Sequence, residues 1–242
     1  NALSAACVHE GKMALNKREL WRKRLFLPNY KISDVARYAN VSPRTVVAWH
    51  KAGDRKTLSS REQRAALSYL QLIEVAVVAA FRKAGVGLKQ IREAREYLAK
   101  HLSSNFPFAE YRFKTDGRNL FMDYEQLEGD LGRGKLLRPD KQGQLAWEEV
   151  LGRLREFEYE QKGVVIRWHV AGPSSSIIID PRIAFGAPAV KGTPTWILKG
   201  RWDAGEGVKS IADDFGLKAP EVKEALDFEG VGSNSRQPKW RH

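Results

Sequence analysis

The sequence predicts a mainly α-helical fold with small β elements, and three observations lead to this class. One pattern, in which a short turn separates two amphipathic helices, occurs twice, at 32–51 and at 211–226. Between the copies, 67–81 is densely apolar on most sides, as expected of a buried or paired helix. Runs of β-forming residues at 164–170 and 176–179 predict short strands ahead of the second copy.

The two copies share the residue types that let two helices cross closely. A small alanine, Ala36 or Ala212, follows an apolar residue, and a turn residue, Asn40 or Gly216, comes four positions later. The alanine leaves room for the second helix, and the turn residue can adopt a left-handed backbone conformation. In the first copy the second helix begins after Ser42, a favourable N-cap residue. The spacing therefore predicts two helix-turn-helix units.

The remaining segments follow in order from their composition. A basic amphipathic helix precedes the first copy, and a basic, Gly-containing wing follows it. The apolar helix and a second helix are separated by a glycine break. A hairpin, a linker, a short helix, two strands and a loop with Gly and Pro then lead to the second copy and a polar tail. In chain order these segments are 13–27, 51–64, 67–81, 88–102, 111–124, 129–144, 146–159, 164–170, 176–179, 180–195 and 230–242.

The positive charge is concentrated in the N-terminal half. The chain has a net charge of +12, and residues 1–116 hold 22 Lys and Arg against 10 Asp and Glu. Residues 117–242 hold 19 of each kind. A basic half that contains a helix-turn-helix favours binding to a polyanion such as nucleic acid.

The composition argues against several other classes of protein. The single cysteine, Cys7, allows neither an internal disulfide nor a thiolate metal site, which fits a reducing cytoplasm. No apolar run approaches the ~18 residues of a membrane span. The five histidines have no metal-ligand spacing, and no phosphate-binding glycine loop is present. We therefore expect a cytoplasmic binding protein with no catalytic residues, no metal and no cofactor.

The first helix-turn-helix carries the candidate DNA-binding residues. In a major-groove docking, the first residues of the second helix meet base edges. Arg44 is the candidate for a guanine contact because its guanidinium can donate twice, and Ser42 and Thr45 are candidates for phosphate contacts. A helix pair used only for packing, with a solvated basic face, is the alternative. The full predicted set, on the outward face or in the wing, is Ser42, Arg44, Thr45, Ala48, His50, Lys51, Arg55 and Lys56.

The second helix-turn-helix lies in an acidic context. Residues 205–229 hold seven Asp and Glu against three Lys, and the second helix of the pair presents Glu221 and Glu224. Negative side chains repel phosphate, so this copy favours a protein-binding or dimerising unit over a DNA-binding one. A packing domain without a partner is the alternative.

The N-terminal part resembles the MerR family of regulators. The resemblance rests on Ile32–His50, on the helix at 67–81 and on the segment RKAGVGLKQIREAREYL, and it covers about residues 30–102. It implies a DNA-binding winged helix-turn-helix followed by a helix, a glycine-containing break and further helix. The chain departs from the family after Arg64, where a hairpin and linker replace a long coiled coil. It also lacks a cysteine pair for metal sensing.

Residues 177–229 resemble a small domain of unknown function found in VapB-like antitoxins. Joined to a MerR-like head, this domain implies the antitoxin of a VapBC-type module. The implied partners are a PIN-like ribonuclease toxin, the operator DNA through which the antitoxin represses its operon, and a second copy of the chain. Within the motif, Asp180 and Arg182 beside Pro181 are expected to fix a turn. The matching residues are Asp180-Pro181-Arg182, Gly186, Pro188, Gly192-Thr193 and Gly205, followed by the helix pair.

The polar tail supplies the candidate toxin-binding residues. PIN-like nucleases hold Mg²⁺ with clustered carboxylates, so an antitoxin can block the site with a cation. In the tail, Arg236, Lys239 and Arg241 flank Trp240, which can anchor in an apolar pocket while an arginine pairs with carboxylates. A solvated tail is the alternative. For the whole chain, the alternatives are a MerR-like transcriptional regulator without a toxin and an excision factor of phage type.

These interpretations divide the chain into four regions. Residues 13–124 form a MerR-like DNA-binding and dimerisation region, in which the helix at 67–81 helps two chains to pair. Residues 125–162 are a linker with a short helix, 163–230 the antitoxin-type domain, and 231–242 a flexible tail. The predicted architecture is a winged helix-turn-helix, a helical middle and a trihelical, homeodomain-like C-terminal domain preceded by short strands.

Overall fold

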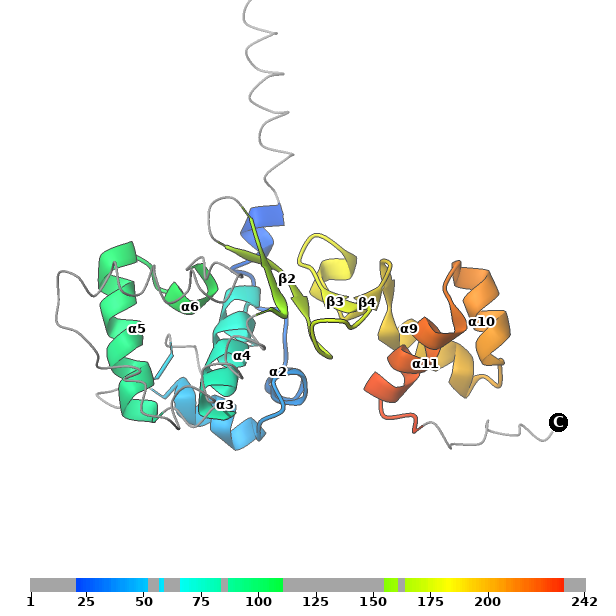
Figure 1. The fold of residues 1–242 in the computed structure, drawn as a ribbon, viewed down its shortest axis with the longest axis horizontal. Helices are drawn as coiled ribbons and strands as arrows, with labels where there is room; N and C mark the ends of the chain where they lie inside the picture. The colour runs from blue at the N-terminus through cyan, green and yellow to red at the C-terminus, as the bar shows by residue number, and fades with distance from the viewer. Residues whose placement is uncertain are drawn as a thin grey trace, which may run out of the picture.

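The computed structural model describes residues 21–51, 57–58, 66–83, 87–110, 155–160 and 164–232. Within these ranges an antiparallel five-stranded sheet lies between two groups of helices (Figure 1). The N-terminal group runs from α2 to α6, and the C-terminal group holds α9, α10 and α11. This arrangement confirms the predicted class, a mainly helical fold with a small sheet ahead of a trihelical C-terminal unit.

In the described residues, the N-terminal group opens with helical residues 21–24, followed by the first helix pair, α2 (Ile32–Tyr38) and α3 (Pro43–Trp49). An isolated antiparallel bridge joins Tyr30 to Leu67, so the chain entering the pair lies beside the chain that returns after the wing. The helices α4 (Tyr69–Lys83), α5 (Leu88–Leu102) and α6 (Pro107–Glu110) complete the group. The predicted helices at 67–81 and 88–102 are thereby confirmed.

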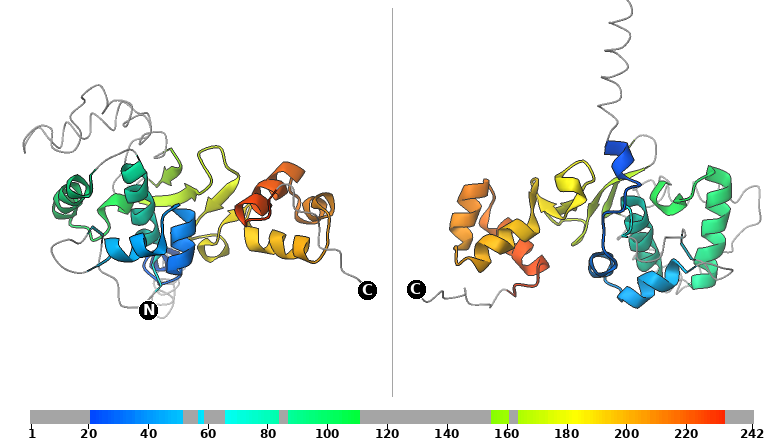
Figure 2. Two further views of the ribbon diagram at one scale, coloured as in Figure 1. Left: turned by 90° about the horizontal axis from the view of Figure 1, so that it is seen from below. Right: turned by 180° about the vertical axis from the view of Figure 1, so that it is seen from behind.

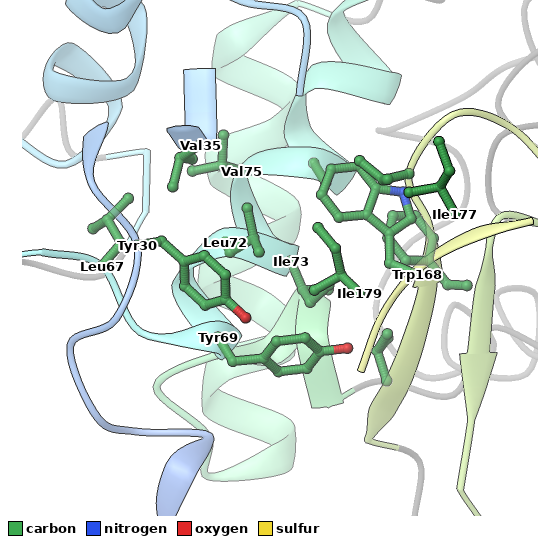
Figure 3. Packing of buried hydrophobic residues seen from close by; sticks show 14 of the residues in the cluster. Tyr30, Val35, Leu67, Tyr69, Leu72, Ile73, Val75, Trp168, Ile177 and Ile179 are labelled. Carbon is green, nitrogen blue, oxygen red and sulfur yellow. The ribbon is translucent and has the colours of Figure 1, made fainter. Parts of the chain in front are cut away.

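Helix α4 is the centre of the packing between the N-terminal group and the sheet (Figure 3). Its side chains Leu72, Ile73 and Val75 are fully buried and lie between residues of the first helix pair and residues of the sheet (Figure 3). Burying such a side chain contributes about 1.5–3 kcal/mol each. Most of its apolar residues are buried within one chain, and the predicted role of this helix in pairing two chains stays a prediction.

The sheet is a simple antiparallel meander in the order β1-β2-β3-β4-β5. Its inward side chains meet α4, and Phe157 pairs with Trp168 across β1 and β2, with the ring centroids 5.7 Å apart. The predicted helix at 146–159 is wrong at its end, where the alternation Phe157-Glu158-Tyr159 forms a strand because one face of it is buried. The strands are β1 (Phe157–Tyr159), β2 (Val165–His169), β3 (Ile177–Ile179), β4 (Ala189–Val190) and β5 (Thr193–Pro194).

The C-terminal group follows the sheet directly. A 3₁₀ turn, η1 (Ala184–Gly186), lies between β3 and β4, and α9 (Thr195–Asp203) starts as soon as β5 ends. The second predicted helix pair is α10 (Val208–Phe215) and α11 (Ala219–Phe228). In two further views, the C-terminal group and α5 lie on opposite sides of the sheet (Figure 2). Among the described residues, no helix is long and apolar enough to cross a membrane.

Several predictions fall outside the described residues. These are the hairpin at 111–124, the linker at 129–144, most of the wing, and the tail from residue 233 onward. The candidate residues Arg55 and Lys56 of the wing, and Arg236, Lys239, Trp240 and Arg241 of the tail, are among them.

Candidate nucleic-acid interface

The turn between α2 and α3 has the geometry of a helix-turn-helix. Asn40 adopts the left-handed conformation with φ 51°, and the backbone N–H of Val41 donates to the carbonyl oxygen of Ala36 at 2.9 Å. Ala36 is buried where the helices cross, and Val46 and Trp49 of α3 are buried beneath the pair. The roles predicted for the small, turn and apolar positions are all confirmed.

The first turn of α3 is fixed by its own hydroxyl groups. The Oγ of Ser42 accepts a hydrogen bond from the backbone N–H of Thr45 at 3.0 Å, which makes Ser42 the N-cap. The two side-chain oxygens lie 2.8 Å apart and share a second hydrogen bond. Ser42 is exposed and Thr45 is half-buried, so both hydroxyls stay at the surface while the cap holds their positions.

The outward face of α3 carries a short row of exposed side chains. Arg44 and Ala48 lie one turn apart, and Lys51 follows just beyond the end of the helix. Val47 belongs to the same face and is 43% exposed, and it is not among the predicted DNA-binding residues. Its position three residues after Arg44 was the available signal, because residues three apart share a helix face. The helix lies at the lower edge of the molecule in Figure 1.

His50 does not belong to this face. The sequence places it outward, but only 3% of the residue is exposed, so this prediction is wrong. The physical reason is the returning wing: the backbone N–H groups of Thr57 and Leu58 both donate to the carbonyl oxygen of Trp49, at 3.2 and 2.9 Å. The chain after α3 therefore folds back over the helix end and covers His50.

The described part of the wing is anchored on α5. The side chain of Arg92 donates from Nε to the Oγ1 of Thr57 at 3.1 Å, and Leu58 is fully buried. This arrangement fixes the position of Thr57 and Leu58 relative to α3 and α5. It leaves the exposed Lys51 at the point where the wing departs.

Helix α2 is held against the C-terminal group. Arg37 donates from Nη1 to the carbonyl oxygen of Phe228 at 3.1 Å and to Oε2 of Glu229 at 3.2 Å. The rings of Tyr38 and Phe228 stack at 5.9 Å, and burial raises the pKa of the Tyr38 hydroxyl. The first helix pair is thus oriented by contacts with the end of α11.

The second helix pair repeats the same turn. Gly216 has φ 62°, and the N–H of Leu217 donates to the carbonyl oxygen of Ala212 at 2.9 Å. Its carboxylates, however, serve internal contacts. Glu221 accepts from the backbone N–H of Lys218 at 2.7 Å and from Lys191 at 3.0 Å, and these two bonds lower its pKa.

Glu224 is used in the same way. It accepts hydrogen bonds from the hydroxyl of Ser175 at 2.6 Å, and from the backbone N–H of Ser176 at 3.2 Å and its hydroxyl at 2.5 Å. These bonds tie α11 to the turn between β2 and β3. Glu221 and Glu224 are each only half-exposed. The acidic face that the sequence predicts for α11 is therefore partly occupied by hydrogen bonds within the chain.

The loop after β3 is built around Asp180. Its carboxylate accepts from the backbone N–H of Arg182 at 2.8 Å and from the Nε of Arg182 and of Arg167 at 2.9 and 3.0 Å. Burial alone would raise the pKa of Asp180, but the hydrogen bonds from Arg182 and Arg167 bring it below its ordinary value. The turn predicted for Asp180 and Arg182 is confirmed.

The same loop receives the N-terminal head. The hydroxyl of Tyr30 donates to the carbonyl oxygen of Gly186 at 2.9 Å, and burial strongly raises its pKa. A Cβ atom at Gly186 would lie 2.1 Å from that hydroxyl oxygen, and φ is +78° there. Gly186 therefore allows a contact between two segments that were predicted to belong to separate regions.

Comparison with known proteins finds a family match in each half of the chain. Residues 30–98 match the model of the MerR HTH family of regulatory proteins, and residues 177–228 match DUF433, a family of unknown function. The chain is 24% identical over 229 residues to a Mycobacterium tuberculosis protein named "Putative antitoxin VapB45", covering 84% of this chain and 95% of that protein.

A solved structure shares the fold. The crystal structure of Rv2018 from Mycobacterium tuberculosis superposes with a TM-score of 0.65 at 21% identity, over 84% of this chain and all of that chain. Together with the two family matches, these similarities confirm the resemblance to VapB-like antitoxins with a MerR-type helix-turn-helix head.

Proposed function

We propose that this chain is the antitoxin of a VapBC-like toxin–antitoxin module, present in the cytoplasm as a homodimer. It binds and neutralises a PIN-like ribonuclease toxin, and it represses its own operon by binding operator DNA. The observation that carries the proposal is the pairing, in one chain, of an outward-facing α3 with a DUF433 domain, in a chain that aligns with 95% of the length of a protein named as a putative antitoxin.

The DNA-binding half of the proposal rests on the surface of α3. Arg44, Val47 and Ala48 are exposed on one face of a capped helix, and Lys51 follows it. Arg44 reads a guanine through two parallel hydrogen bonds, and Val47 and Ala48 contact a thymine methyl group. Ser42, Thr45 and Lys51 approach phosphates, together with Arg55 and Lys56 of the wing. His50 is excluded from this set by its burial.

The toxin-binding half rests on the antitoxin similarity and on the tail. Arg236, Lys239 and Arg241 around Trp240 offer cations to a nuclease whose active site is rich in carboxylates, and the indole offers an apolar anchor. Truncation after Gly232 tests this role, because the preceding Val231 is tied to α11 through its backbone N–H and must stay. The truncated chain is expected to inhibit the toxin more weakly, and unchanged inhibition would remove the tail from the proposal.

The experiment that tests the proposal is co-expression with the product of the adjacent open reading frame, followed by size-exclusion chromatography. A stable complex with a nuclease, and binding to the chain's own upstream DNA that weakens with salt, is the expected result. DNA binding without any complex would leave a stand-alone regulator. A complex without DNA binding would leave an antitoxin that does not repress its operon.

A cleft favours the regulator as a second candidate. It measures about 620 Å³, a size typical of small-molecule sites, and lies between the α2–α3 turn, the end of α4 and the sheet. Tyr38 and Asn40 line it on one side and Trp168 on the other, so an occupant would touch the helix-turn-helix and the C-terminal sheet together. A ligand that changes operator affinity in the absence of any toxin would support this reading.

A further inference from the structure

The loop between β3 and β4 displays an aromatic side chain in a strained conformation. Phe185 is 72% exposed. It has φ 54°, and the preceding Ala184 has φ 47°, so two consecutive non-glycine residues are left-handed. Each such residue costs about 1–2 kcal/mol of stability. Strain of this kind persists only where the surroundings hold it, and it concentrates at functional surfaces.

Hydrogen bonds from other segments fix the backbone of this loop, whereas the ring of Phe185 stays largely exposed. Asn29 donates from Nδ2 to the carbonyl oxygen of Phe185 at 2.6 Å, and Tyr30 donates to that of Gly186 at 2.9 Å. The carboxylate of Asp180 fixes the start of the loop through the N–H of Arg182. The Phe185 ring gains little burial in return, and its neighbour is the guanidinium of Arg24, whose Cζ lies 4.8 Å from the ring centre.

The surface around Phe185 has an excess of positive charge. The two segments that meet at the loop, 21–31 and 181–191, contain six Lys and Arg and no Asp or Glu. Three of these cations, Arg22, Arg182 and Lys191, pair with Glu160, Asp180 and Glu221, so Lys23, Arg24 and Lys31 supply the excess. Phe26 and Leu27, in the first of these segments, are also 55% exposed. A basic surface repels an identical one, so a second copy of the chain does not fit here through the same face. An aromatic and an arginine amid basic residues fit an acidic protein surface with an apolar pocket.

The surface also lies apart from α3. The helical residues 21–24 and the loop with η1 occupy the upper edge of the molecule in Figure 1, and α3 occupies the lower edge. The view from behind gives the same separation (Figure 2). Duplex DNA docked on α3 therefore leaves Phe185 open, and a protein can bind there at the same time.

We propose that Phe185, with Arg24 against its ring, anchors an acidic protein partner, and that this partner is the nuclease toxin. The identity of the partner rests on the proposed function, whereas the anchoring surface is read from the loop itself. The phenyl ring enters an apolar pocket of the partner, and Arg24 pairs with a carboxylate at the rim of that pocket. Aromatic and arginine side chains are the residue types that most often dominate such contacts.

The test compares the full-length chain with Phe185→Gly in binding to the purified product of the adjacent gene at ~0.15 M salt. Glycine adopts φ 54° without strain, so the variant is expected to unfold at the same temperature or higher. Its affinity for the nuclease is expected to fall about tenfold or more, the loss typical of an anchor residue. Trp196→Ala is the matched control, an aromatic 61% exposed on α9, and is expected to bind within about twofold of the wild type.

The possible outcomes separate this inference from the proposed function. If the wild type and Phe185→Gly bind the nuclease equally, the anchor is overturned and the antitoxin reading stands. If the wild type does not bind the nuclease, both are overturned. A loss of affinity accompanied by a lower unfolding temperature overturns the anchor in favour of a structural role. Unchanged nuclease binding with lost binding to phosphatidylserine vesicles overturns it in favour of a membrane contact.

Discussion

The two helix pairs, α2–α3 and α10–α11, share one backbone and differ in what their second helix does with its polar side chains. Both turns are left-handed, at Asn40 and Gly216, and both are closed by the same backbone hydrogen bond to an alanine carbonyl, at 2.9 Å in each case. On α3 the exposed face is left to solvent. On α11 the carboxylates are bonded to the sheet and its loops.

Equivalent positions make the contrast concrete. Where α3 has Thr45 and Ala48, α11 has Glu221 and Glu224. Thr45 bonds to the Ser42 cap of its own helix, whereas Glu224 reaches three donors in the turn between β2 and β3. A helix-turn-helix backbone therefore does not define a DNA-binding unit by itself. The contacts already made by the outward side chains decide whether the surface is free to bind another molecule.

Replacing Arg44 with alanine gives the largest expected effect on the DNA side of this comparison. We expect affinity for the chain's own upstream DNA to fall by about 2 kcal/mol, roughly 30-fold, because a bidentate guanine contact is lost. Fluorescence anisotropy at fixed salt measures it. Lys223→Ala removes an exposed cation from α11 and serves as the control, with DNA affinity expected to stay within about twofold. Equal losses in the two variants would mean that only overall charge matters.

Replacing Glu224 with glutamine tests the internal role of α11. The carboxylate accepts from two hydroxyls and a backbone N–H, so its loss is expected to destabilise the chain by about 1.5 kcal/mol in urea unfolding. Asp227→Asn makes the same chemical change at an exposed site on the same helix and is expected to cost less than about 0.5 kcal/mol. DNA affinity is expected to remain that of the wild type in both, and a gain in Glu224→Gln alone would place α11 at the DNA, because the substitution removes a charge that repels phosphate.

The turn residues allow a symmetric test. Gly216→Ala is expected to destabilise by about 1 kcal/mol, because φ is +62° and a Cβ there meets no atom within 4 Å, so only the backbone conformation is penalised. Asn40→Gly has the opposite sign, and we expect a gain of a few tenths of a kcal/mol, since glycine relaxes the same conformation. Thermal unfolding of both variants measures the difference. If both substitutions shifted the unfolding temperature in the same direction and by the same amount, the left-handed backbone would not determine the stability of both turns.

The sequence was a good guide where local pattern decides the structure. The alanine and turn positions of both helix pairs, the Ser42 cap and the apolar α4 each follow from short-range spacing, and the structure has them as predicted. The wing, the hairpin and the tail lie outside the described residues, so their predicted roles remain predictions.

The errors arise from contacts between one element and another, which the spacing of residues within a single helix does not report. His50 lies on the outward side of α3 by helical spacing, but the returning chain at Thr57 and Leu58 covers it. Phe157 fits the helical pattern of the sequence before it, but it lies in a strand because it pairs with Trp168 of the neighbouring strand. The partners of Glu224, some 48 residues away, and the display of Phe185 leave no signal in local spacing.

Acidification is expected to destabilise α10 and α11 more than α2 and α3. This difference is the smallest of the effects predicted here. Asp180 and Glu221 have pKa values below their ordinary range when folded, and both lie in the C-terminal region. Because each folded pKa is lower than the unfolded one, about 4, these groups stabilise the fold above pH ~4, and the contribution is lost as the pH falls through the folded values. Amide hydrogen exchange at pH 6 and pH 3, corrected for intrinsic rates, should therefore show α10 and α11 losing protection before α2 and α3.

The Asp180→Asn variant decides whether this order comes from the carboxylate. Without the charge, Arg167 and Arg182 lose their shared acceptor, so the variant is expected to be less stable at pH 6 and to differ less from the wild type at pH 3. If the two pairs lose protection together at every pH, they unfold as one unit through the contacts of Arg37 and Tyr38 with α11. The difference between the pairs would then lie in their surfaces alone, and not in their stability.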